Sequence, residues 1–166
     1  DVLHLNAQET TSLVGLGMMG MAIMTLFSQL VVIPKLDPSV RTMLISGAIL
    51  LVIPFCMFLL PMSKTLLVVS MVISGFGFGL IRTGTAAGAS LVVEPEEQGA
   101  VAGLIGATAA IGIIFVPITA MALYSYVDPV APYILGLVVS AFMLFMVSGA
   151  GFRHMNRVLS QDTPII

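Results

Sequence analysis

The sequence predicts an all-α fold, a polytopic transmembrane helix bundle of five spans. Three observations predict it. Only 8% of the residues are charged, against about 25% in soluble domains. The mean hydropathy is +1.13. The apolar residues are also grouped into stretches of about 20, the length that an α-helix needs to cross a bilayer core about 30 Å thick.

The first two spans are separated by a strong break. The first covers residues 12–33 and is uncharged throughout. It ends at Pro34–Pro38, where two prolines and two charged residues predict a turn. The second covers residues 43–60, and the polar stretch Pro61–Lys64 follows it.

Three further apolar stretches complete the bundle. Polar residues Glu94–Gln98 separate the third span from the fourth, and Tyr124–Pro129 separates the fourth from the fifth. The three spans and the polar cytoplasmic tail that follows them cover residues 66–93, 100–123, 132–149 and 150–166. Buried strands would need turn residues every 8–12 positions or so, and soluble helices would need a polar face. The five stretches have neither, so transmembrane helices are the interpretation that remains.

Several classes of function have no support in the sequence. The net charge is −2 without a basic block, which argues against nucleic acid as a partner. The single cysteine, Cys56, rules out an internal disulfide and is interpreted as a small buried apolar side chain. His4 and His154 lie outside the spans and are interpreted as solvated loop residues. We find no metal-ligand cluster, no nucleophile–base arrangement and no cofactor motif, and therefore predict no catalytic residue, metal or cofactor.

The basic residues predict the orientation of the chain. Lysine and arginine concentrate on the cytoplasmic side of membrane proteins. If the spans alternate in direction, Lys64 lies on one side. The other side carries the remaining basic residues Lys35, Arg41, Arg82, Arg153 and Arg157. This distribution predicts a cytoplasmic C-terminus and an outer end marked by tyrosines at 124, 126 and 133.

Glycines are concentrated in the third span and at the start of the fourth. Small residues four apart share one helix face and let two helix backbones approach closely. Prolines at 54 and 117 would kink the second and fourth spans. Two interpretations remain open, tight static packing and helices that rock against their neighbours during transport. The residues assigned to packing and rocking are Gly75, Gly77, Gly79, Gly84, Gly88, Gly99, Gly103 and Pro117.

Arg82 is the single charged residue inside a predicted span. It lies about 16 residues into the third span, roughly 25 Å along a helix. An arginine at membrane depth is costly and should face protein or water. It either reaches the cytoplasmic interface by extending its long side chain, or lines a water-filled cavity and contacts an anionic group.

These motifs resemble the second half of a major facilitator superfamily transporter, and more narrowly the drug:proton antiporter branch. The glycine run from Gly75 to Gly79 and the following Ala89–Val92 resemble that family's tenth helix. Glu96–Leu104 resembles its loop into the eleventh helix, Pro34–Arg41 a decayed loop between helices eight and nine, and Asp1–Leu5 the end of helix seven. The chain departs from the family pattern in lacking a proline near Thr83 and a glycine before Pro117.

The resemblance implies a function and a set of partners. The chain would form helices eight to twelve of a twelve-helix transporter, with an N-terminal half of the same chain as its partner. It would export small amphipathic compounds or drugs by alternating access, coupled to protons, in a bacterial inner membrane. The first, third and fourth spans would line the cavity, with Arg82, Thr83, Thr85 and Gln29 as candidate substrate-cavity residues. The alternatives are a facilitator that imports or exports a small metabolite, and a non-transporting scaffold or signalling subunit.

Overall fold

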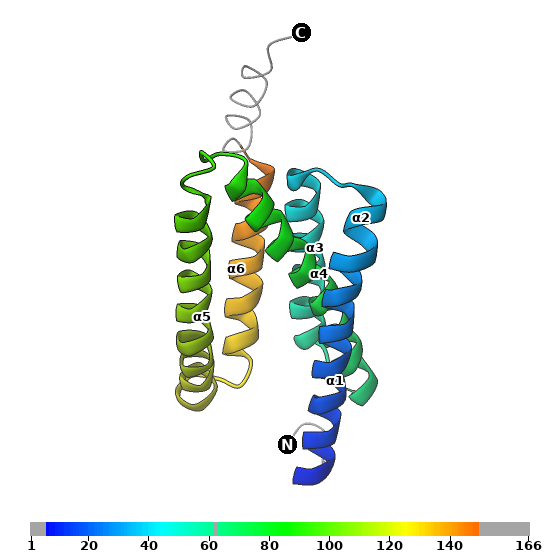
Figure 1. The fold of residues 1–166 in the computed structure, drawn as a ribbon. Coiled ribbons are helices and arrows are strands. Elements are labelled where there is room, and N and C mark those ends of the chain that lie inside the picture. The colour runs from blue at the N-terminus through cyan, green and yellow to red at the C-terminus, as the bar shows by residue number, and fades with distance from the viewer. Residues whose placement is uncertain (1–5, 62, 150–166) are drawn as a thin grey trace.

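The computed structural model describes residues 6–61 and 63–149, and these form a bundle of helices (Figure 1). The first three helical segments make one continuous rod, because a short π-helical turn, η1, joins α1 to α2. The segments are α1 (Ala7–Phe27), η1 (Ser28–Val32), α2 (Ile33–Leu36), α3 (Val40–Phe58), α4 (Lys64–Ser90), α5 (Gln98–Tyr126) and α6 (Ala131–Ser148).

Five of the helices in the described residues are long and apolar enough to cross a membrane. They cover Gln8–Leu36, Val40–Phe58, Lys64–Ser90, Gln98–Tyr126 and Ala131–Ser148. The predicted all-α fold class with five spans is therefore confirmed. The chain is an integral, multi-pass membrane protein.

Polar side chains begin three of the five long helices. Asn6 and Glu9 form a capping box at the start of α1, in which the Glu9 N–H donates to Asn6 Oδ1 at 2.8 Å. The side chains of Ser39 and Ser63 accept hydrogen bonds at the starts of α3 and α4. These caps satisfy N–H groups that have no partner within the helix. Because of the Asn6 cap, α1 begins before the apolar stretch that starts at Ser12.

Several helix ends differ from the predicted spans, and two of the differences change which residues belong to a connection. The first rod continues through Pro34 to Leu36, where Asp37 ends it with a left-handed φ of 42°. A proline is tolerated near the start of a helical segment, and Pro34 is the second residue of α2. At the other difference, α4 ends at Ser90, so the apolar residues 91–93 belong to the connection to α5.

The π turn accommodates this proline inside the first rod. A proline ring crowds the carbonyl four residues earlier, which is that of Leu30 in the middle of η1. Within η1 the Ile33 N–H reaches back five residues and donates to the Ser28 carbonyl. One extra residue is thereby held in the turn without ending the helix.

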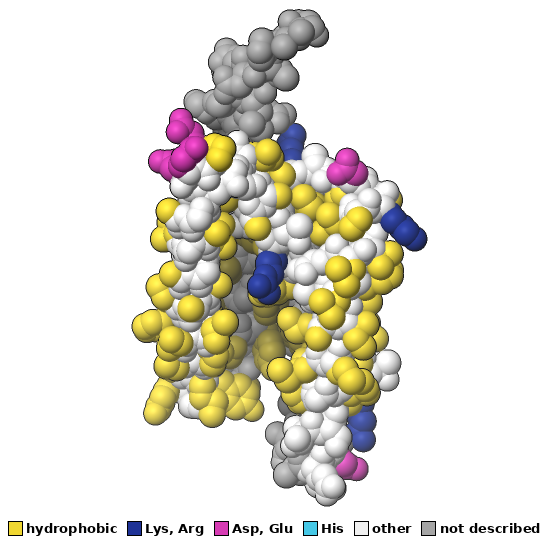
Figure 2. Space-filling model, viewed as in Figure 1, with side chains coloured by type: hydrophobic (Ala, Val, Ile, Leu, Met, Phe, Trp, Pro, Cys, Tyr) yellow, Lys and Arg dark blue, Asp and Glu magenta, His cyan; other side chains and the backbone are white. Residues whose placement is uncertain are grey.

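The long helix α4 is central in the bundle (Figure 1). It packs most extensively against α3 and α1, and α6 packs against the other side of α3. Helix α5 makes smaller contacts with α6 and α4, and none of its residues is buried. The buried apolar residues of the described chain are few, Met43, Ala48 and Leu80. Apolar side chains instead cover much of the outer surface (Figure 2), as expected where lipid replaces water.

Candidate functional site

The interface between α4 and α1 depends on two glycines of α4. A Cβ atom added at Gly75 would lie 2.7 Å from the Met21 Cα atom, and one added at Gly79 would lie 2.9 Å from the Thr25 carbonyl oxygen. These are backbone atoms, which cannot rotate away as a side chain can. Glycine at both positions therefore brings the two backbones into direct contact.

The same helix uses three other glycines against α3. Gly77 faces Gly47, and a Cβ atom added at either residue would lie 3.0 Å from the other's carbonyl oxygen. Further along α4, an added Cβ at Gly84 would lie 3.1 Å from Met43 Cβ, and one at Gly88 would lie 3.0 Å from Val40 Cγ1. Helix α4 is thus held between two neighbours by glycines on two of its faces.

A hydrogen bond also crosses the α1–α4 interface. The Thr25 hydroxyl lies 2.8 Å from the Gly75 carbonyl oxygen of α4 and 2.9 Å from the Met21 carbonyl oxygen of its own helix. A hydroxyl has one proton, so the two carbonyls share a single donor. One turn further along, Ser28 is fully buried and donates to the Thr25 carbonyl at 2.8 Å. Ser28 is the first residue of the π turn and Thr25 lies in the last turn of α1 before it, so close packing and the irregular turn meet in one place.

The third face of α4 is open and carries Arg82. The side chain is exposed and makes no hydrogen bond or ion pair with residues 6–61 or 63–149. Arg82 lies eight residues before the end of α4, about 12 Å along the helix axis. A pocket of about 390 Å³ lies beside it, between α4 and the first part of α5. Its lining residues are Arg82, Ala86, Ala89, Ser90, Gln98, Val101, Ala102, Ile105 and Gly106.

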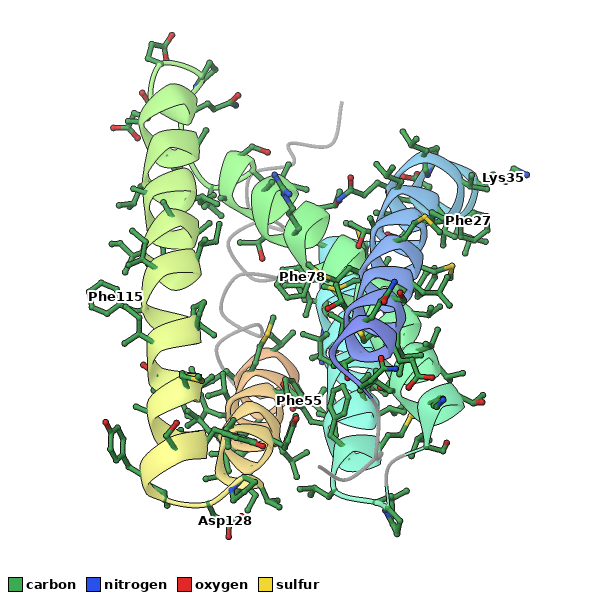
Figure 3. The ribbon with its side chains drawn as sticks, turned by 90° about the horizontal axis from the view of Figure 1, so that it is seen from below. Phe27, Lys35, Phe55, Phe78, Phe115 and Asp128 are labelled. Carbon is green, nitrogen blue, oxygen red and sulfur yellow. The ribbon has the colours of Figure 1, made fainter. Side chains whose placement is uncertain are left out.

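The views of the molecule agree with this description. Figure 2 shows a face hollowed between α5 and the α1 rod, with a basic side chain at mid-height in the hollow. In Figure 3, in which the molecule is seen from below, Phe115 points away from the bundle on the outer side of α5, and Phe78 lies on the side of α4 that faces the gap. Phe78 is 53% exposed and lies one helical turn before Arg82. The open face of α4 therefore presents an aromatic ring and a cation in successive turns.

The other three candidate cavity residues do not line the Arg82 pocket. Thr85 is exposed and lies three residues after Arg82, and so belongs to the same side of α4. Thr83 is half-buried and lines a separate, more polar pocket of about 910 Å³ with Asp37 and Arg41, at the end of the bundle where α2 meets α3. Gln29 is half-buried within the π turn. The structure thus places the four predicted residues at more than one location.

The remaining glycines and prolines of the sequence prediction have different surroundings. Cβ atoms added at Gly99 and Gly103 would meet no atom within 4 Å in the described residues. Their assignment to helix packing therefore stays a prediction. Pro117 lies inside α5, in which no residue is buried. Pro54, by contrast, lies inside α3 and is among the most fully buried side chains.

An apolar pocket of about 540 Å³ lies between α3, α5 and α6, where the sequence predicted no site. The Phe55 ring packs directly on Gly136 of α6, and the rings of Phe58 and Tyr133 are 5.2 Å apart between their centroids. The sequence predicts for Tyr133 only a place among the interfacial tyrosines. A glycine opposite an aromatic residue on another helix is the signal that could have indicated this pocket, but it requires knowing which helices are neighbours.

One sequence interpretation is wrong. Cys56 is exposed on α3 and not buried, because an apolar residue in a membrane helix can face lipid as readily as protein. The predictions for His4, Asp1–Leu5 and the tail, including Arg153, His154 and Arg157, lie outside the described residues.

Comparison with known proteins identifies one family. A model of the Major Facilitator Superfamily matches residues 1–155, nearly the whole chain. No curated protein and no solved structure matches significantly. The matched region includes all five membrane helices, and members of this family are secondary transporters that move small molecules across the bilayer. The chain belongs to the major facilitator superfamily.

Proposed function

We propose that the chain forms helices eight to twelve of a twelve-helix exporter that moves small amphipathic compounds in exchange for protons. In this assignment α1 with η1 and α2 is helix eight, α3 is nine, α4 is ten, α5 is eleven and α6 is twelve. An N-terminal half of the same protein would cover the hollow face shown in Figure 2 and complete the cavity. The protein would lie in a bacterial inner membrane with its C-terminus in the cytoplasm.

The observation that carries the proposal is the position of Arg82. A charged side chain at membrane depth costs about 3 kcal/mol or more on insertion scales. Within the described residues nothing neutralises it, and it opens onto a pocket between two membrane helices. Structural packing alone gives no reason to retain such a residue, whereas a cavity that receives a polar substrate does.

The glycine interfaces support the alternating-access part of the proposal. Backbones in direct contact at Gly75, Gly79 and Gly77 leave few interlocking side chains between α4 and its neighbours. Helices with such smooth surfaces can shift against one another at lower cost than helices held by large side chains. We assign rocking of α4 between α1 and α3 to these contacts, and we extend the same role to Gly99, Gly103 and Pro117 on α5.

The test is proton-driven flux through the full-length protein in lipid vesicles. A pH gradient should drive movement of amphipathic compounds, and dissipating the gradient with a protonophore should stop it. The variant Arg82→Ala should insert into the membrane at the normal level and lose most of its flux. Lys64→Ala, at the start of the same helix, is the matched control and should transport normally. Normal flux through Arg82→Ala would mean that Arg82 only extends to the membrane interface.

The same experiment separates the alternatives. A facilitator for a small metabolite would move one compound of a metabolite panel, and its deletion would leave drug susceptibility unchanged. A scaffold or signalling subunit would show no substrate-dependent flux at all.

A further inference from the structure

We propose that the pocket beside Arg82 binds the anionic group of the substrate, so that the transporter selects anionic amphiphiles over cationic ones. The inference rests on the proposed transport function and specifies the substrate class of that same site. It concerns the pocket between α4 and α5 defined by Arg82, Ser90, Gln98 and Ile105, together with the neighbouring residues already described.

The distribution of charge in the described helices is the first argument. Acidic residues occur there in the first turn of α1, as Glu9, and otherwise in connections between helices, as Asp37, Glu94, Glu96, Glu97 and Asp128. None of them lines the Arg82 pocket. A cationic substrate would therefore meet a fixed positive charge without any carboxylate to offset it. Like charges repel strongly where water is scarce, so this half of the cavity disfavours cations.

The polar groups of the pocket are the second argument. Arg82 offers five N–H donors in a planar fork that matches a carboxylate. Gln98, the first residue of α5, lines the same pocket, and its amide nitrogen is only loosely held, 3.5 Å from the Ser90 carbonyl oxygen. The Gln98 amide can therefore turn toward a ligand and give up only this one weak hydrogen bond. Both side chains donate hydrogen bonds, which a carboxylate or sulfonate accepts and an ammonium group cannot.

The apolar part of the pocket is the third argument. Alanines 86, 89 and 102 line it with Val101 and Ile105, and its volume of about 390 Å³ falls in the usual range for small-molecule sites. Phe78 lies one turn away on the same side of α4 and is 53% exposed. A ligand with a carboxylate at Arg82 can thus place an apolar body along α4 toward Phe78. This arrangement fits a compact amphipathic acid.

The experiment compares three probes that share one apolar body. Phenylbutanoate carries the anionic group, phenylbutanamide is neutral, and phenylbutyl-trimethylammonium is cationic. Binding is measured as the shift in thermal unfolding of the purified full-length protein in detergent, and transport as flux into vesicles under a pH gradient. We expect phenylbutanoate to stabilise the protein most, the amide less, and the cation not at all.

Variants at Arg82 test the cause of this preference. Arg82→Gln should weaken phenylbutanoate binding by about tenfold or more, the usual effect of losing one charge-assisted hydrogen bond, and leave amide binding unchanged. Arg82→Lys should retain most of the preference because it keeps the charge. The control Lys64→Gln should bind all three probes as the unmodified protein does.

Three results would overturn the inference. The first is stabilisation by the cation equal to that by the carboxylate, and the second is unchanged phenylbutanoate binding by Arg82→Gln. The third is an equal loss of all three probes in Arg82→Gln, which would mean that Arg82 pairs with a carboxylate elsewhere in the protein. If the full-length protein still transported neutral or cationic compounds in any of these three cases, the proposed transport function would remain supported. Conversely, binding of phenylbutanoate that depends on Arg82, without any proton-driven flux, would support the anion site and contradict the transport proposal.

Discussion

Replacing Gly75 by alanine tests whether direct backbone contact holds α4 against α1. The added methyl group would lie 2.7 Å from the Met21 Cα atom and closer still to its carbonyl oxygen, and neither atom can rotate aside. An ordinary contact requires about 3.4 Å or more, so α1 and α4 must separate by roughly 1 Å at this point. That movement also stretches the 2.8 Å hydrogen bond from Thr25 to the Gly75 carbonyl.

The expected loss of stability follows from three contributions. Overpacking of a close interface costs about 1–3 kcal/mol, and weakening an interhelical hydrogen bond in a membrane costs about 0.6 kcal/mol. Alanine has a higher helix propensity than glycine, and this offsets up to about 1 kcal/mol of the loss in unfolding free energy. We therefore expect a net loss of about 1–2 kcal/mol, which corresponds to a fall in the unfolding temperature of roughly 2–8 °C. Thermal unfolding of the full-length protein in detergent measures it.

Two matched variants show whether the contact is the cause. Gly15→Ala lies on α1 where no atom approaches an added Cβ within 4 Å, and it should unfold at or slightly above the original temperature. Gly84→Ala would meet Met43 Cβ at 3.1 Å and the movable end of the Leu44 side chain at 3.2 Å, both longer than the closest contacts at Gly75, and should fall between the other two. If Gly75→Ala were as stable as Gly15→Ala, the claim of backbone contact between α1 and α4 would be refuted.

Three further predictions concern other contacts. Thr25→Val removes the interhelical hydrogen bond and should cost about 0.6 kcal/mol in the same unfolding assay, whereas Thr119→Val in α5, where the hydroxyl bonds only within its own helix, should cost less. Cys56 is exposed on the lipid-facing surface of α3, and maleimides react with thiolates, which form in contact with water, so neither a membrane-permeant nor a membrane-impermeant maleimide should label it in intact cells; labelling by the impermeant reagent would place Cys56 in an aqueous region. Gly103→Leu should leave the packing of the described helices unchanged yet reduce transport by the full-length protein, because we assign Gly103 to the rocking of α5 during transport; full transport would contradict that assignment.

The fold class was predictable because its signal is local. Each membrane helix is defined by about 20 apolar residues in a row and needs no information about its neighbours. The ends were less predictable, since a polar cap such as Asn6 extends α1 beyond the apolar stretch and Pro34 continues the rod instead of ending it. The π turn at Ser28–Val32 was not anticipated, because nothing in apolar periodicity distinguishes it from an α-helix.

The candidate site was predictable in part for a related reason. Charge in a membrane span is conspicuous, so Arg82 could be chosen from sequence alone. Glycine spacing likewise indicated that Gly75 and Gly79 share a face, and the structure places that face against α1. Which helix would meet the face, and which polar residues would join Arg82, depended on the arrangement of the helices. Thr83 lines a different pocket from Arg82 although the two are adjacent in sequence, because neighbouring residues of a helix point about 100° apart.

The π turn in the first rod has a consequence for how its length could change. In a regular α-helix, deleting one residue rotates everything beyond it by about 100° and carries every side chain off its partner. The turn at Ser28–Val32 already holds one surplus residue, and Leu30 within it is 71% exposed. Removing Leu30, together with replacing Pro34 by a residue that has an N–H such as alanine, would let the segment close into ordinary α geometry while Thr25 and Lys35 keep their facing directions. Along this rod, therefore, the stretch from 28 to 32 is the place where evolution or an engineer could shorten the helix by a single residue without turning its far end.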